Sequence, residues 1–202
     1  MPATVGAVTD VRTRLSTTDD WVAEIDAARQ GDDEAFRSLY REVHPNLLRY
    51  LRALVGADAE DVASEAWLHI IRDLHTFRGD GAGFRAWAAT VARHRAMDHL
   101  RRSRSRPVSP IPLDALPDQP GPQDTAGQAF ESLSARAAVA LIATLPREQG
   151  EAVLLRVLFG LNVEVTARIL GKRPGAVRTS TYRGLRRLAQ LLGPDRPEEV
   201  PS

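Results

Sequence analysis

Six prolines lie between Ser103 and Asp124 and divide the chain into two parts. Proline lacks a backbone N–H and disrupts a helix interior, so a packed helix cannot cross this segment. Proline-rich segments are extended and act as spacers, and at ~3.1 Å per residue this one could reach roughly 60 Å. The sequence therefore predicts two folded blocks that can sit far apart, joined by an extended linker at residues 105–125.

Both blocks have helical sequence patterns, and no segment alternates convincingly between apolar and polar residues as a half-buried strand would. In the first block we expect helices at Asp20–Gln30, Asp33–Val55, Glu60–His75 and Phe84–Arg102, with Pro45 kinking or resetting the second of them. In the second block we expect helices at Thr125–Leu145, Pro146–Phe159, Val163–Leu170 and Pro174–Leu192, with Pro146 in a first helical turn. The predicted fold is all-α, with two small helical domains at residues 19–104 and 126–193, a disordered segment at 1–18 and a tail at 194–202.

The composition excludes several classes of protein. The chain has no cysteine, which rules out a disulfide framework and any cysteine-based zinc site. We find no secretory signal, and arginines interrupt every apolar run long enough to suggest a membrane span. We therefore expect a cytoplasmic protein without membrane insertion. The five histidines lack metal-binding helix spacing, and there is no phosphate loop or nucleophile elbow, so we expect no metal, cofactor or catalytic residue.

Positive charge is concentrated in two segments, although the net charge is only +1. Residues 85–106 contain seven arginines against Asp98 alone, and residues 164–192 contain seven basic residues against Glu164 alone. Two basic segments on a nearly neutral chain predict two places that contact a polyanion.

The second basic segment has the pattern of a helix-turn-helix. A short helix ends at Gly171, and Pro174 opens a longer one, which is the arrangement of that motif. On a helical wheel of the longer helix one side carries Val177, Thr181, Leu185, Leu188 and Leu192, which we expect to pack. The other side carries Thr179, Arg183, Arg186 and Gln190, donors suited to phosphates and base edges. A solvated basic face on an ordinary bundle helix would show the same pattern.

The first block combines an acidic helix face with an aromatic and basic helix. Within Ala59–Leu68 and the residues that follow, one helix face carries Asp61, Glu65, His69 and Arg72, which could equally serve helix stability. On the later helix one face carries Trp87, Val91, His94 and Asp98. Aromatic stacking and basic groups suit the binding of separated nucleic-acid strands. Trp87 fits a buried core position equally well, and Asp98 fits a residue that orients Arg95 or Arg101.

These motifs, in this order and spacing, resemble the extracytoplasmic-function branch of the sigma-70 family of RNA polymerase sigma factors. The resemblance covers roughly Asp33–Arg104 and Thr144–Leu192. It implies a factor without catalytic activity that binds core RNA polymerase and directs it to promoters. The first domain would bind the β′ clamp helices and melt the −10 element, and the second would read the −35 element and touch the β flap. Core polymerase and promoter DNA are the implied partners, and an anti-sigma factor is a further one that the resemblance allows.

The resemblance assigns residues to each role. Binding of the −35 element is assigned to Lys172, Arg173, Arg178, Thr179, Ser180, Arg183, Arg186 and Arg187. Binding and melting of the −10 element is assigned to Arg85, Trp87, His94, Arg95, Arg101 and Arg102. Binding of core polymerase is assigned to Asp61, Glu65, Leu68 and Arg72.

The chain departs from the family pattern at several of these positions. His94 replaces the asparagine that lines the pocket for a flipped −10 base, and Gly150 replaces an arginine. Thr166, Lys172, Ala176, Ser180 and Thr181 are further departures, within the helix-turn-helix. Two other classes of protein remain as alternatives: an enzyme, for which no catalytic constellation is present, and a stand-alone helix-turn-helix regulator. The regulator would explain Leu161–Leu192 but not the motifs of the first block.

Overall fold

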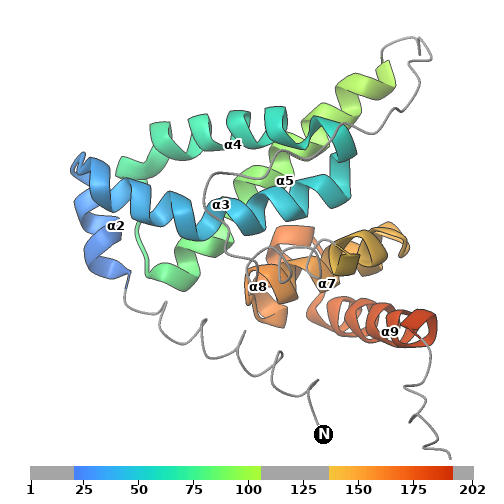
Figure 1. Cartoon of the computed structure of the whole chain (residues 1–202). Coiled ribbons are helices and arrows are strands. Elements are labelled where there is room, and N and C mark those ends of the chain that lie inside the picture. The colour runs from blue at the N-terminus through green and yellow to red at the C-terminus, as the bar shows by residue number, and fades with distance from the viewer. Residues whose placement is uncertain (1–20, 106–136, 193–202) are drawn as a thin grey trace, which may run out of the picture.

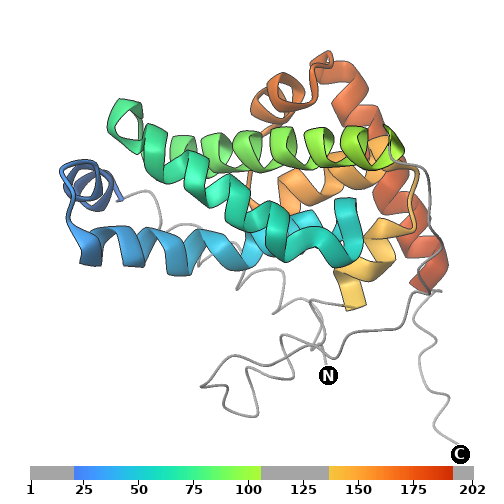
Figure 2. The same cartoon turned by 90° about the horizontal axis from the view of Figure 1, so that it is seen from above.

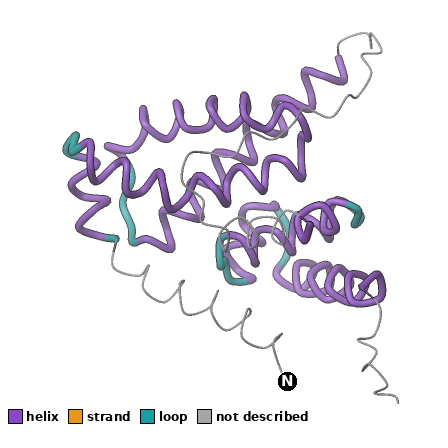
Figure 3. Tube along the Cα trace, in the orientation of Figure 1, coloured by secondary structure: helices purple, strands orange, loops and turns teal. Residues whose placement is uncertain are grey.

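The computed structural model describes residues 21–105 and 137–192, which form helices joined by turns and contain no strand (Figure 3). The all-α prediction is therefore confirmed for this part of the chain. The predicted N-terminal segment, almost all of the linker and the predicted tail lie outside the described residues. Within the described ranges, no helix combines the length and the apolar character needed to cross a membrane.

The first block consists of four helices, α2 to α5, with two short 3-10 turns between them. Their bounds are α2 Val22–Arg29, α3 Asp33–Val55, α4 Ala59–Asp73 and α5 Gly81–Ser105, with the turns at Gly56–Asp58 and Leu74–Thr76. α3 runs through Pro45 without a break, so the expectation that Pro45 resets this helix is wrong. α5 begins earlier than Phe84 because Asp80 caps it, its Oδ1 accepting a hydrogen bond from the Gly83 amide at 2.7 Å.

The core of the first block forms where α3, α4 and α5 meet. α4 contributes its predicted apolar face, with Val62, Ala66 and Ile70 at most 1% exposed. α5 contributes a stripe of alanines, Ala89, Ala92 and Ala96, all fully buried, which lets neighbouring helices approach closely. This packing fixes which sides of α4 and α5 remain for partners.

The second block consists of a helical stretch at residues 137–143, then α7 Arg147–Leu158, α8 Val163–Leu170 and α9 Pro174–Leu192. Pro146 precedes α7 with extended ψ of 133° instead of opening its first turn, a small correction. Asn162 caps α8 by accepting a hydrogen bond from the Val165 amide at 2.8 Å. Gly171 ends α8 in the left-handed region at φ 63°, as the helix-turn-helix pattern predicts.

The side of α9 that packs on α7 differs from the expected one. Val177, Thr181 and Leu188 are buried as expected, but Leu185 is 49% and Leu192 75% exposed. Gly184 is buried in their place. A Cβ at Gly184 would lie 2.9 Å from Val153 Cγ2, so α7 and α9 make their closest approach there. A helical wheel identifies the buried side of a helix from its large apolar residues. It cannot detect a glycine that lets a neighbouring helix approach closely.

Gly150 has a similar role on a neighbouring side of α7. A Cβ at this position would lie 3.1 Å from the carbonyl oxygen of Ile142, in the preceding helical stretch. The replacement of a family arginine by glycine is therefore a packing feature of this chain.

The two blocks contact each other in this structure. α7 lies against α3, and α8 lies against α5, so the C-terminal helices cover one side of the first block in both views (Figures 1 and 2). The ring of Tyr50 meets that of Phe159 edge-on, with centroids 5.8 Å apart. The length of the linker allows the blocks to separate, but here they share one continuous apolar core.

We expect Gly184→Ala to lower the free energy of unfolding by about 1–3 kcal/mol, because the new methyl group would overpack the α7–α9 contact. Urea unfolding followed by circular dichroism measures the change. Gly175→Ala is the matched control in the same helix, since a Cβ there meets nothing within 4 Å. Equal stability of the two variants would contradict the close approach.

Candidate nucleic-acid interfaces

The outward face of α9 presents the predicted polar side chains to solvent. Thr179, Arg183, Arg186 and Arg187 are exposed, and Ser180 is half-buried. α8 and its Gly171 turn hold this helix against the second block, so its N-terminal half projects as a rigid ridge. A helix of this kind can lie in a DNA major groove and present its donors to base edges and phosphates.

Two of the predicted basic residues already have carboxylate partners within the second block. Lys172 Nζ lies 2.5 Å from Glu148 Oε1, and Arg178 Nη2 lies 3.0 Å from Glu164 Oε1. Both carboxylates are more than half exposed, so these pairs are screened and cost little to exchange for phosphate.

Tyr182 is a functional candidate that the sequence analysis missed. Its side chain is 67% exposed, and the helical wheel places it between Arg178 and Arg186 on the outward side of α9. A phenol there can contact a thymine methyl group and donate one hydrogen bond to a base edge. The helical wheel could have identified Tyr182, but the prediction was based on the basic and small polar residues of this helix.

Trp87 on α5 is only partly buried, and it packs against the core from its edge. The ring is half-buried and stacks on Phe77 with centroids 5.1 Å apart. Its other side borders a cleft of about 260 Å³, where Thr90 on α5 faces Val165 and Ile169 on α8. Trp87 is thus a fixed aromatic surface at the edge of the core.

The other predicted residues of the first basic segment spread along α5. His94 is exposed and shares a cleft of about 390 Å³ with Arg93, Met97 and Arg101. Arg85 lies at the other end of the helix, with its guanidinium 5.4 Å from the centroid of the Trp21 ring. The structure therefore brings His94 and Arg101 together and places Arg85 apart from them.

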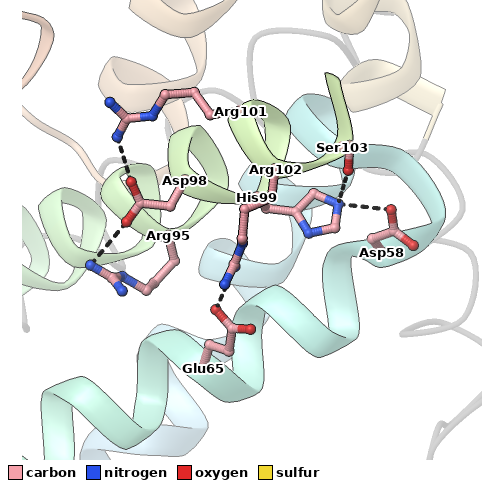
Figure 4. Close-up of polar contacts among 8 residues, drawn as sticks. All are labelled: Asp58, Glu65, Arg95, Asp98, His99, Arg101, Arg102 and Ser103. Atoms are coloured by element: carbon pink, nitrogen blue, oxygen red, sulfur yellow. Dashed lines mark hydrogen bonds and ion pairs between the residues drawn. The ribbon is translucent and has the colours of Figure 1, made fainter. Parts of the chain in front are cut away.

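Carboxylates position the arginines near the end of α5 (Figure 4). Asp98 forms an ion pair with Arg95, at 3.1 Å, and accepts a hydrogen bond from Arg101, so this carboxylate orients both guanidinium groups. The hydrogen bond from Arg101 lowers the pKa of Asp98 below its usual value. Arg102 Nη2 lies 3.2 Å from Glu65 Oε2 on α4, so a predicted DNA-binding residue and a predicted polymerase-binding residue are paired.

The exposed side of α4 combines charge with apolar surface. Asp61 and Arg72 are exposed, and Leu68 is 68% exposed. Ile71, which the sequence analysis missed, is 51% exposed beside Leu68. The guanidinium of Arg72 donates a hydrogen bond to Asp73 at 2.8 Å, which lowers the pKa of Asp73. Apolar side chains rimmed by charges are typical of a protein–protein contact surface.

A cleft of about 630 Å³ lies between the α4 surface and the end of α5. Its lining includes Asp61 and Glu65 from α4 with His99 and Arg102 from α5. His99 Nε2 lies 2.8 Å from Asp58 Oδ2 at the mouth of the same region (Figure 4). The two predicted interfaces of the first block are therefore neighbours. Among residues 21–105 and 137–192, no three histidine or acidic side chains cluster as a metal site would require.

Comparison with protein families matches both blocks. The family model described as sigma-70 region 2 matches residues 39–106, and the model described as sigma-70, region 4, matches residues 135–188. The two matches correspond to the two described blocks and leave the proline-rich segment between them.

Curated relatives match along most of the chain. The ECF RNA polymerase sigma factor ShbA of Streptomyces griseus is 35% identical over 181 residues, which cover 84% of this chain and 93% of that protein. The ECF RNA polymerase sigma factor BldN of Streptomyces coelicolor is 39% identical over 175 residues, which cover 85% of this chain but 65% of that protein.

Solved structures show the same fold. The sigma factor RpoE in complex with the anti-sigma factor NepR from Bartonella quintana superimposes with a TM-score of 0.58 at 24% identity, covering 80% of this chain and 98% of that one. CnrH in complex with the cytosolic domain of CnrY gives a TM-score of 0.56 at 20% identity, covering 86% and 97%. From its two family regions and these relatives, the chain belongs to the extracytoplasmic-function group of the sigma-70 family, whose members are transcription initiation factors.

Proposed function

We propose that the two blocks divide promoter-specific initiation between them, with the second block reading the −35 element and the first binding polymerase and melting the −10 element. The observation that carries this is the outward face of α9, where Thr179, Tyr182, Arg183 and Arg186 are exposed together on a helix-turn-helix. On this proposal the protein acts in the cytoplasm, where the polymerase acts.

The first block supports the other half of the proposal through two adjacent surfaces. Leu68 and Ile71, with their charged neighbours on α4, suit the β′ clamp helices. Exclusion of water from such an apolar centre strengthens a protein–protein contact. On α5, Trp87 and His94 offer stacking surfaces worth ~1–3 kcal/mol per base to separated strands. Arginines held by Asp98 and Glu65 are preorganised, so a phosphate need only replace one carboxylate oxygen.

We also propose that the second block contacts the β flap and that the protein has an anti-sigma factor as a partner. RpoE and CnrH, which share the fold, were each solved with a bound protein partner. The family likeness supports an anti-sigma factor as a class of partner, and the identity of any such protein is a separate question.

Run-off transcription tests the proposed function as a whole. Purified full-length chain is added to core RNA polymerase on genomic fragments, and transcript starts are mapped. We expect starts that core enzyme alone does not produce. A stand-alone regulator would instead bind duplex DNA without polymerase and give no transcripts unless another sigma factor were added.

Arg183→Ala should weaken recognition of the −35 element by about 1–3 kcal/mol at fixed salt, because one base or phosphate contact is lost. Binding of the reconstituted holoenzyme to promoter fragments measures the change. Arg37→Ala, on the exposed side of α3, is the charge-matched control and should leave promoter affinity unchanged. Weakened binding to core polymerase by Arg183→Ala would place this residue in another interface.

Leu68→Ala should reduce affinity for core polymerase by about 1–2 kcal/mol, since a central apolar contact is truncated. The folded state should be unaffected because Leu68 is 68% exposed. Fluorescence titration of labelled full-length protein with core polymerase measures the effect. Val22→Ala, at a site 47% exposed on α2, is the control, and equal affinities for the two variants would refute the α4 interface.

His94→Asn should change the base preference within the −10 element, because an exposed imidazole and an amide offer different hydrogen-bonding groups to a base. A promoter library transcribed with wild type and variant reads out the preference. An unchanged preference at every −10 position would remove His94 from base selection.

A further inference from the structure

The middle of α7 is buried on all of its sides. Residues 150–155 are all buried, and they complete more than one helical turn. One side packs on α9 around Gly184, and the opposite side packs on α3 of the first block. A helix buried all round belongs inside a core, so the packing of the two blocks on each other is part of how this helix is covered.

A charged residue lies inside this contact. The side chain of Glu151 on α7 is only 5% exposed, and its Oε2 accepts hydrogen bonds from Nε and Nη2 of Arg93 on α5, both at 3.2 Å. Its Oε1 accepts a hydrogen bond from Arg147 Nε at 3.0 Å. The carboxylate thus joins two guanidinium groups, one from each block, as a phosphate would.

Neighbouring contacts close around this cluster. The Arg147 guanidinium also reaches Met97 Sδ on α5, and Tyr50 packs on Phe159. Burial raises the pKa of Tyr50 above its usual value, and the negative charge of Glu151 raises it further. Removing one partner from this cluster would leave an uncompensated charge in the contact, so a single substitution here should disfavour the closed arrangement.

The closed arrangement is incompatible with reading a whole promoter. The −35 and −10 elements are centred about 25 base pairs apart, which is roughly 85 Å along B-DNA at ~3.4 Å per base pair. Here α8 of the helix-turn-helix contacts α5 directly. The clefts beside Trp87 and His94 are bordered by Ile169 and Arg147 of the second block, so that block also limits access of a DNA strand to α5.

We propose that Glu151, held between Arg93 and Arg147, is a latch that keeps the free factor in a closed, self-inhibited form. In this form Arg93 is unavailable to the DNA backbone, and the two reading surfaces cannot span one promoter. Polymerase binding separates the blocks and returns all three charged groups to solvent or to nucleic acid. The inhibitory effect of the latch rests on the proposed function, but the latch itself can be tested without polymerase or DNA.

A distance measurement on the full-length chain tests the latch. Because the chain has no cysteine, Ser64→Cys on α4 and Gln190→Cys on α9, both exposed, give two unique sites for spin labels. Wild type should give one short, narrow distance distribution. Glu151→Gln, which keeps the shape but removes the charge, should shift the distribution to longer and broader distances, and so should Arg93→Gln.

Two comparisons make this measurement decisive. Glu148→Gln is the matched control on α7, since Glu148 is 69% exposed and its ion pair with Lys172 lies within the second block. Glu151→Gln and Arg93→Gln act on one contact, so the double variant should open no further than either single one. Distributions identical to wild type in both single variants, with circular dichroism unchanged, would overturn the latch. Opening by Glu148→Gln to the same extent would do so as well.

Association with core polymerase tests whether the latch inhibits. If only the open form binds, the observed rate scales with the open fraction, and Glu151→Gln should associate about tenfold faster than wild type. Opening without faster association would overturn self-inhibition. If neither wild type nor Glu151→Gln binds core polymerase, the proposed function fails instead, whatever the distance measurement shows.

Discussion

The burial of α7 is the constraint on which the rest of the structure depends. Gly184 allows α9 to approach α7 closely, and this fixes which side of α9 faces outward with its arginines. Gly150 allows the preceding helical stretch to approach from another direction. The remaining side of α7 is covered by the first block, and there an apolar contact surrounds the single carboxylate of Glu151. The outward face of α9 and the contact between the two blocks therefore both follow from the packing of one helix.

Carboxylates hold several arginines of α5 in place. Asp98 holds Arg95 and Arg101, Glu65 holds Arg102, and Glu151 holds Arg93. The first three pairs are open to solvent, so phosphate can replace the carboxylate at little cost. The pair of Glu151 is buried and joins two blocks, so its exchange requires a change in domain arrangement. An arginine–carboxylate pair thus preorganises the arginine where the pair is open to solvent, and opposes separation of the blocks where the pair is buried between them.

Much of the fold was predictable from local sequence signals. Pro174, Gly171 and the apolar spacing of α8 and α9 fix the helix-turn-helix, because caps and breakers act within a few residues. The acidic and aromatic motifs of the first block indicated candidate surfaces through the family they resemble. The packing side of α9 was not predictable, since a glycine contact depends on the neighbouring helix. Glu151 could not be found either, because its partner Arg93 lies 58 residues away and no local pattern joins them.

We propose that one chain reads two separated promoter elements with two different helices. Photo-cross-linking tests this most directly, with a photoreactive residue at Tyr182 on α9 or at His94 on α5, in the complex of full-length protein, core polymerase and promoter DNA. We expect cross-links about 25 base pairs apart on the same promoter, which at ~3.4 Å per base pair is a separation of roughly 85 Å. Cross-links from both positions to the same few base pairs would contradict it.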